Sequence, residues 1–243
     1  MAIVRQPGDA PAPAESVSHA EFTDLYTKKP DPWDLATKWY DQRKYAITVA
    51  SLPRPRYRRC YEPGCSIGEL TKLLAARCDE LLAADFVESA VAQARTAVQD
   101  LTNVTVTRSV LPAELPDGPF DLVVVSELLY YLSTRDMKQL VDGIVERLEP
   151  HGDLVAVHYR DDRRQHYDGV TVHAELLSRP QLHSIVHYED EAFILDILRR
   201  RTRGTTLIHG AVQAAGNLLP RGAERRRPTR LTPTPDGHDK ARQ

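Results

Sequence analysis

The fold of this chain is decided by the stretch Arg59-Cys60-Tyr61-Glu62-Pro63-Gly64-Cys65-Ser66-Ile67-Gly68-Glu69-Leu70. An apolar approach that ends in an acid leads into a turn of small residues, and a helical pattern follows directly. This order predicts a strand, a tight loop and a helix N-terminus, the place where an α/β protein presents backbone amides to a ligand. Gly64 lets the chain turn sharply after the strand, and Gly68 lets the helix lie close to the sheet.

Strand and helix patterns alternate on the C-terminal side of this loop, which is typical of a parallel sheet with crossover helices. We predict strands at about 58–63, 81–85, 104–107, 120–125, 154–158, 184–188 and 192–198. The run 120–125 is the most apolar and is expected at the centre of the sheet. Only three acidic residues separate the last two strands, so they form an antiparallel hairpin. The sequence thus predicts a Rossmann-like α/β fold with seven strands, mostly parallel, and helices on both faces.

The 243 residues suffice for one α/β domain with appendages, and 27% charged against 42% hydrophobic residues is an ordinary globular composition. Residues 1–18 are rich in Ala and Pro and are expected to be disordered. A helical segment at 19–55, with a long helical pattern over 34–50, precedes the α/β domain at 56–203. Residues 204–243 decay into Gly, Pro and Arg and are expected to form a disordered basic tail.

The bulk composition argues against several classes of protein. A net charge of −2 gives no global reason to expect nucleic acid or membrane as a partner, and no apolar run approaches the roughly 20 residues that span a bilayer. Three cysteines without a Cys-x-x-Cys motif indicate reduced thiols in a cytoplasmic protein. His158, Asp161 and Asp162 could be drawn as a metal site, but aspartate pairs in loops are normally solvated, so we expect no metal.

The loop spacing favours a ligand without phosphate. Gly-x-Ser-x-Gly with an acid two residues upstream differs from the Gly-x-Gly-x-x-Gly that holds a pyrophosphate. Glu62 ends its strand, where its carboxylate can meet a cation, and Ser66 stands between the two glycines. There are two alternative interpretations of this loop: a dinucleotide site, and a tight turn that binds no ligand.

Asp85 narrows the choice of ligand. It closes the second predicted strand, where an acid can accept hydrogen bonds from two ribose hydroxyls, and Phe86 could pack on a purine. The alternative is a helix N-cap. The Glu-x-Gly-x-Ser-x-Gly loop resembles the Glu/Asp-x-Gly-x-Gly-x-Gly of class I S-adenosylmethionine (SAM) methyltransferases, which predicts SAM as cofactor. Ser109 and Val110 stand where many of these enzymes place an Asp for the adenine, so adenine recognition is weakly specified.

Polar residues appear abruptly after the central strand. Ser126 is expected beside the cofactor and Glu127 as a catalytic base, with Tyr130 and Tyr131 lining the acceptor pocket. The alternative is that both tyrosines pack between helix and sheet.

Two histidines are further candidates. His158 follows the next strand and could take a proton from the attacking nucleophile, because a histidine pKa lies near neutrality. A structural histidine with satisfied hydrogen bonds is the alternative. His173 is the next candidate for acceptor binding.

Four further pieces point to a particular branch: Asp31-Pro32-Trp33-Asp34, Tyr40-Asp41-Gln42-Arg43-Lys44-Tyr45, Arg56-Tyr57-Arg58-Arg59 and Ser126-Glu127-Leu128-Leu129-Tyr130-Tyr131-Leu132. With the glycine loop they resemble the NodS-like branch of SAM-dependent methyltransferases over about residues 20–201. The resemblance implies that residues 19–55 fold over the bound cofactor as a lid. It assigns Trp33, Tyr40 and Arg43 to that lid, with Arg43 as partner of the methionine carboxylate.

The resemblance also implies an activity. NodS N-methylates the amino group of a deacetylated chitooligosaccharide, although many members of the branch have no stated acceptor. We therefore expect methyl transfer to a small polar acceptor, such as the amine of an amino sugar or oligosaccharide. O-methylation of a bacterial secondary metabolite and a non-catalytic SAM-binding role are the alternatives. The chain lacks the Asn/Asp-Pro-Pro-Tyr/Phe motif of DNA amino-methyltransferases after its fourth strand, which argues against nucleobases.

Overall fold

The computed structural model describes residues 15–160 and 167–202, and every statement below concerns these residues. The predicted basic tail at 204–243, most of the predicted disordered N-terminus, and Asp161 and Asp162 lie outside them. None of the helices in this part of the chain is long and apolar enough to cross a membrane.

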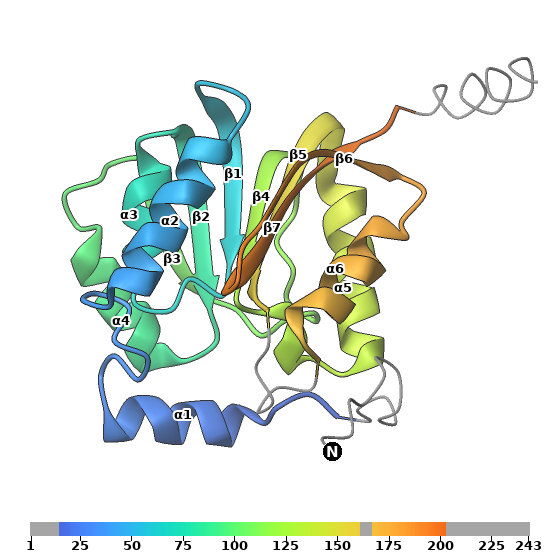
Figure 1. Ribbon diagram of the computed structural model, residues 1–243. Helices are drawn as coiled ribbons and strands as arrows, with labels where there is room; N and C mark the ends of the chain where they lie inside the picture. The colour runs from blue at the N-terminus through green and yellow to red at the C-terminus, as the bar shows by residue number, and fades with distance from the viewer. Residues whose placement is uncertain (1–14, 161–166, 203–243) are drawn as a thin grey trace, which may run out of the picture. The chain divides into compact units, whose positions relative to one another are not determined.

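Seven strands form one sheet in the order β3-β2-β1-β4-β5-β7-β6, which confirms the predicted architecture (Figure 1). The strands are β1 (Tyr57–Pro63), β2 (Cys78–Asp85), β3 (Val104–Arg108), β4 (Phe120–Ser126), β5 (Leu148–Tyr159), β6 (Leu182–Glu189) and β7 (Phe193–Arg200). β7 pairs antiparallel with both β5 and β6, and the other pairings are parallel. The apolar strand β4 takes the central position, as its composition predicts.

Strand β5 begins six residues earlier than its predicted start at 154. Pro150-His151-Gly152 reads as a turn in the sequence, but here it forms an irregularity within the strand. His151 has a positive φ of 64°, and the pairing register with β4 shifts between Phe120 and Leu122. Two steps along β4, from Phe120 to Leu122, face five along β5, from Leu148 to Asp153, so β5 stays paired on both sides of three extra residues and the turn residues do not end it.

The helices are α1 (His19–Lys28), α2 (Trp39–Ser51), α3 (Glu69–Ala75), α4 (Glu88–Ala97), α5 (Thr134–Arg147) and α6 (Gly169–Leu177), with a 3-10 turn η1 (Leu129–Tyr131). In Figure 1, α2, α3 and α4 cover one face of the sheet, and α5 and α6 cover the other. The predicted helix over 34–50 starts only at Trp39, since Asp34 adopts a positive φ of 61° in the preceding turns.

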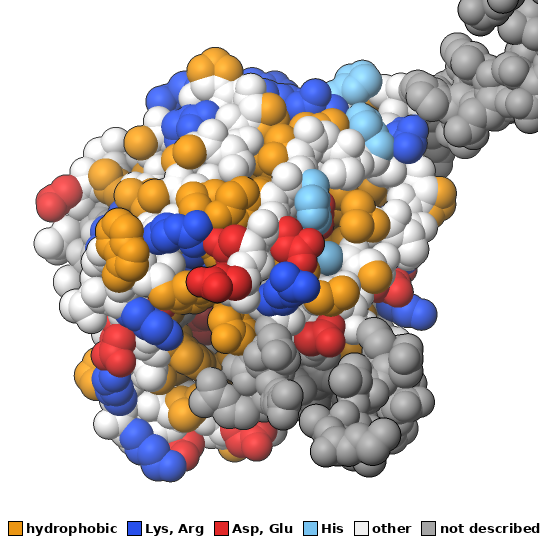
Figure 2. All heavy atoms as spheres, viewed as in Figure 1, with side chains coloured by type: hydrophobic (Ala, Val, Ile, Leu, Met, Phe, Trp, Pro, Cys, Tyr) orange, Lys and Arg blue, Asp and Glu red, His pale blue; other side chains and the backbone are white. Residues whose placement is uncertain are grey.

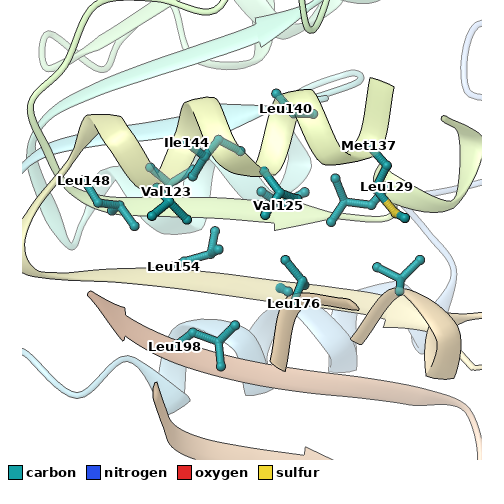
Figure 3. Close-up of a cluster of buried hydrophobic side chains, with 14 of the residues drawn as sticks. Val123, Val125, Leu129, Met137, Leu140, Ile144, Leu148, Leu154, Leu176 and Leu198 are labelled. Atoms are coloured by element: carbon teal, nitrogen blue, oxygen red, sulfur yellow. The ribbon is translucent and has the colours of Figure 1, made fainter. Parts of the chain in front are cut away.

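Side chains of alternate residues in the central strand fill two separate cores. Val123 and Val125 pack with α5, as Figure 3 shows, whereas Leu122 and Val124 pack with α2 and α3 on the opposite face. All four are buried, so the strand reads as a continuous apolar run while still obeying the period of two. Burial on both faces fixes the register of β4 and thereby the position of the residues that follow it.

Helix α1 lies across the end of the sheet to which β1 and β2 point (Figure 1). Its first turn carries the capping box between Ser18 and Glu21. The residues before it are held by hydrogen bonds: Val17 N donates to Tyr131 O (2.8 Å), and Ser133 N donates to Ser16 Oγ (2.8 Å). The predicted disordered segment therefore extends too far at its C-terminal end, because residues 16–18 belong to the folded part.

Candidate active site

The glycine loop follows β1 as predicted. Gly64, Ser66 and Gly68 all have positive φ angles, of 75°, 50° and 85°. A Cβ at Gly68 would lie 3.2 Å from the backbone Cα of Ala94, so the close approach of α4 requires glycine there. The loop thus brings the N-terminus of α3 against α4 and leaves its backbone amides at the carboxyl ends of β1 and β2.

Two buried carboxylates border the loop. Glu62 is 2% exposed, its Oε2 has no hydrogen-bond partner within the described residues, and burial raises its pKa to about 8. Asp85 accepts hydrogen bonds from the backbone N–H groups of Ser66 and Val87, both at 3.0 Å. Burial raises the pKa of Asp85, although these hydrogen bonds oppose the shift. The N-cap of α4 is Val87, so the N-cap alternative for Asp85 is wrong.

Aromatic side chains of the N-terminal segment cover this loop. Phe86 stacks on His19 with ring centroids 4.5 Å apart and meets the edge of Phe22 at 5.4 Å. Phe22 in turn contacts Tyr131, which lies 4.9 Å away. Phe22 of α1 therefore contacts both Phe86, the residue predicted for the cofactor, and Tyr131, the residue predicted for the acceptor.

Tyr26 connects α1 directly to the loop. Its hydroxyl lies 2.5 Å from Ser66 Oγ, and its ring lies 5.6 Å from Trp33 in an edge-to-face arrangement. The Ser66 hydroxyl is therefore engaged by Tyr26, and Trp33 packs against the same tyrosine. The role of Trp33 in a lid over the cofactor stays a prediction. The sequence pattern places Tyr26 at the end of a short helix but contains no signal for its contact with Ser66.

Glu127 is held in place by three donors. Its backbone has a positive φ of 54°. Oε1 accepts from Lys44 Nζ at 2.7 Å, and Oε2 accepts from the Tyr130 hydroxyl and from Tyr159 N at 3.2 Å. The Glu127 side chain keeps 22% of its surface exposed. Tyr130 is buried in the core, as the packing interpretation expects, and bonded to Glu127, while its contact with an acceptor stays a prediction.

Lys44 is a residue of the site that our sequence analysis missed. The residue is 1% exposed, and its ammonium also contacts Asp41 Oδ1 at 2.9 Å. Burial lowers its pKa, but the charges of Glu127 and Asp41 outweigh that effect and raise it overall. In the sequence Lys44 stands between Arg43 and Tyr45 and resembles any exposed helix cation.

The structure gives Arg43 partners on the β6–β7 hairpin. Its guanidinium contacts Asp190 Oδ2 and the Tyr188 hydroxyl, both at 2.7 Å. Figure 2 shows acidic and basic side chains gathered in the middle of this face, between α2 and the hairpin. The role of Arg43 with the methionine carboxylate stays a prediction without support from this geometry. Tyr40 lies deeper, and its buried hydroxyl has no partner within the described part of the chain.

His158 lies in a buried chain of hydrogen bonds. Its Nε2 accepts from Leu129 N at 3.3 Å, so Nδ1 carries the proton and donates to His173 Nε2 at 3.2 Å. His173 Nδ1 then donates to Asp196 Oδ2 at 2.5 Å. Neither histidine is more than 3% exposed. With both ring nitrogens of His158 engaged, this arrangement favours the structural interpretation. The roles of His158 as a base and of His173 in acceptor binding stay predictions without support from this geometry.

Burial and the neighbouring His173 hold the pKa of His158 well below its ordinary value. The unfolded chain therefore binds a proton below about pH 6.5 that the folded protein rejects, and stability is lost as the pH falls. Between pH 6.5 and 5.5 we expect the free energy of unfolding to fall by about 1 kcal/mol more in the wild type than in His158→Gln. Urea unfolding at both pH values measures this, with exposed His151→Asn as control. Equal pH slopes in wild type and His158→Gln would contradict it.

The remaining predicted residues lie around the loop. Ser109 donates its hydroxyl to Glu114 O at 2.7 Å, and Val110 N donates to the Glu114 carboxylate at 2.7 Å. Both are thus engaged within their own turn, and their adenine contact stays a prediction. Ser126 ends β4 half-buried, paired in register with Val157, and its cofactor contact stays a prediction too.

Comparison with known proteins identifies the family. The sequence profile of Nodulation protein S (NodS) matches residues 18–182. Nodulation protein S of Rhizobium tropici is 30% identical over 143 residues, which are 58% of this chain and 60% of that protein. The matched region spans less than two thirds of the length of this relative.

Two solved structures share the fold. A putative methyltransferase from Pseudomonas syringae is 40% identical, with a TM-score of 0.61 over 67% of this chain and 100% of that one. The N-methyltransferase NodS from Bradyrhizobium japonicum WM9, in complex with S-adenosyl-L-homocysteine (SAH), is 24% identical, with a TM-score of 0.68 over 75% of this chain and 98% of that one. The fold is therefore that of the class I SAM methyltransferases. Because the profile match covers more than half of its residues, this chain belongs to the NodS family.

Proposed function

We propose that this protein is a SAM-dependent methyltransferase that methylates the amine nitrogen of a small polar acceptor. Among such amines, an amino sugar or a deacetylated oligosaccharide terminus is the acceptor we propose. Membership of the NodS family supports the reaction class. The geometry around Glu127 supports the nitrogen as the methylated atom.

The residues at the glycine loop fit SAM. The unpartnered Oε2 of Glu62 can receive the α-ammonium group, which explains a buried carboxylate without a counter-charge. Asp85 is oriented by Ser66 N and Val87 N, and a carboxylate held in this way can still accept from ribose hydroxyls. Bound SAM supplies a methyl group on a sulfonium that already reacts readily. The protein mainly has to align the acceptor and exclude water.

Glu127 carries the proposal for the acceptor side. It follows β4, next to Leu128, and a Cβ at Gly64 would lie 3.4 Å from the Leu128 side chain. Glu127 therefore stands one residue from the contact between Leu128 and the glycine loop, and its partly exposed carboxylate can accept an N–H from an acceptor amine. An amine has only to lose one proton, which a carboxylate can accept. A hydroxyl acceptor needs stronger base assistance, and the buried nitrogens of His158 are already engaged.

The test is product analysis by mass spectrometry over a panel of acceptors. The panel contains glucosamine oligomers with a free terminal amine, the same oligomers fully N-acetylated, and phenolic and sugar hydroxyl acceptors. We expect methylation of the free amines and none of the N-acetylated controls. Methylation confined to hydroxyl acceptors would overturn the nitrogen assignment, and absence of SAM and SAH binding in calorimetry would overturn the methyltransferase itself.

The raised pKa of Glu62 predicts that cofactor binding depends on pH. Its raised pKa means that the free protein holds a proton on Glu62 below about pH 8, whereas a bound α-ammonium favours the carboxylate. Binding then releases a proton, and the affinity for SAH should rise by up to about tenfold per pH unit between pH 6.0 and 7.5. Calorimetry at these pH values measures the slope. Glu62→Gln should lose it and Glu69→Gln should keep it; a flat wild-type profile would contradict the prediction.

A further inference from the structure

The buried ion cluster of Asp41, Lys44 and Glu127 joins α2 to the end of β4. Lys44 Nζ lies 2.9 Å from Asp41 Oδ1 and 2.7 Å from Glu127 Oε1, and the rings of Tyr40 and Tyr45 lie 4.9 and 5.3 Å from the ammonium. Asp41 and Lys44 are 3% and 1% exposed. Ions this deeply buried lose hydration that only well-placed partners offset, so the position of Glu127 and that of Lys44 depend on each other.

A count of lone pairs shows what this contact leaves open. A carboxylate offers about four acceptor positions, two on each oxygen. On Glu127, Oε2 already accepts from Tyr130 and Tyr159, and among residues 15–160 and 167–202 Oε1 accepts only from Lys44. One acceptor position therefore remains, on Oε1, the oxygen that Lys44 holds.

We propose that Lys44 is a positioning residue for methyl transfer: it fixes Glu127 so that the remaining lone pair of Oε1 receives an N–H of the acceptor amine. The proposal rests on the proposed function. One ammonium and two carboxylates leave the cluster with a net charge of −1. A cationic or N–H-donating group is therefore favoured at this position, and a carboxylate or phosphate is disfavoured.

The competing explanation is that Lys44 only fills the core under α2. The Tyr130 hydroxyl and Tyr159 N would then hold Glu127 by themselves. A test must therefore separate the position of Glu127 from the stability of the fold, and it must work before the natural acceptor is known.

Sinefungin provides such a test, because this SAM analogue carries an amine at the place of the transferable methyl, whereas SAH carries nothing there. We define the preference for sinefungin as the dissociation constant of SAH divided by that of sinefungin. This preference is high when a carboxylate lies close enough to accept a hydrogen bond from the amine of sinefungin. In Lys44→Met/Asp41→Asn one positive and one negative charge are removed together, so the net charge is unchanged, and such apolar replacements of a buried pair are often tolerated. Calorimetry with both ligands is done on the wild type, on this double variant, on Glu127→Gln and on the triple variant that combines all three substitutions.

We expect Glu127→Gln to lower the preference for sinefungin about tenfold, the size of one charge-assisted hydrogen bond. The double variant should lower it similarly while its SAH affinity stays within about threefold of wild type, and adding the double variant to Glu127→Gln should cause no further loss. Lys44→Arg, which keeps the charge but not the shape, should also lower the preference.

Three outcomes would overturn the proposal. If the double variant and Lys44→Arg keep the wild-type preference while Glu127→Gln loses it, Lys44 does not position Glu127, and the proposed function stands. If both variants lose SAH binding as well, Lys44 maintains the fold or the cofactor site instead. If Glu127→Gln itself leaves the preference unchanged, Glu127 does not face the methyl group, and the acceptor side of the proposed function fails with it.

Discussion

Asp85→Ala is expected to weaken the binding of SAM and SAH by about 30-fold or more. The wild-type carboxylate accepts from Ser66 N and Val87 N and is 9% exposed. Its removal leaves two backbone donors unsatisfied, Ser66 N in the glycine loop and Val87 N before α4, and takes away the acceptor for the ribose hydroxyls. Charge-assisted hydrogen bonds contribute about 1.5–3 kcal/mol each, and about 2 kcal/mol already corresponds to 30-fold in affinity.

Calorimetry with SAH measures this effect, and the matched control is Glu88→Ala. Glu88 lies three residues further on, in the first turn of α4, with 67% of its side chain exposed. Its removal should change the affinity less than threefold, because its charge is solvated. Asp85→Asn keeps one acceptor oxygen and should fall between wild type and Asp85→Ala. An unchanged affinity in Asp85→Ala would show that the cofactor does not use the end of β2.

Glu127→Gln is expected to lower kcat by about 100-fold or more while the SAH dissociation constant stays within about threefold. The amide keeps the shape of the side chain but loses the charge that faces Lys44, and it cannot take up the acceptor proton. General-base assistance contributes about 10²–10⁴ in rate. The effect belongs in kcat rather than in cofactor affinity, since Glu127 is fixed by Lys44, Tyr130 and Tyr159 and not by the glycine loop.

Initial rates on the free-amine acceptor, followed by mass spectrometry, measure this loss. Glu191→Gln is the control, because Glu191 is an exposed acid in the β6–β7 turn on the same side of the sheet. It should keep wild-type turnover. Full activity of Glu127→Gln would show that the acceptor amine loses its proton elsewhere, for example to water.

The comparison of His158 with Glu127 shows where prediction from the sequence succeeds and where it does not. Glu127 directly follows β4 and His158 is the second-last residue of the neighbouring parallel strand β5, so both are correctly expected near the same edge of the sheet. The segments that pack on these two residues decide which of them stays accessible. Glu127, with its positive φ, keeps part of its carboxylate exposed, whereas α6 covers His158 and supplies His173 as its partner. A strand pattern carries no information about which later helix will cover its last residue.

The N-terminal segment shows the same division. Its helices can be predicted from the capping box and from apolar spacing, but such patterns do not give the direction in which a helix lies on the rest of the fold. Arg43 and Lys44 are neighbours on α2, and one turns toward Asp190 while the other is buried against Glu127. Only the position of the helix decides which of the two cations belongs to the site.

By itself the sequence determined the seven-stranded sheet, its central strand and the glycine loop, because these depend on local periodicity and on turn residues at fixed spacing. The family followed from the resemblance of its motifs to those of NodS-like methyltransferases. The tertiary structure alone decided that Ser66 bonds to Tyr26, that Lys44 holds Glu127, and that His158 is enclosed by His173 and Leu129. Each of these contacts joins residues that are between 15 and 83 positions apart in the sequence and that belong to different elements. Such contacts arise from how separate elements pack on one another, and no pattern within one element specifies them.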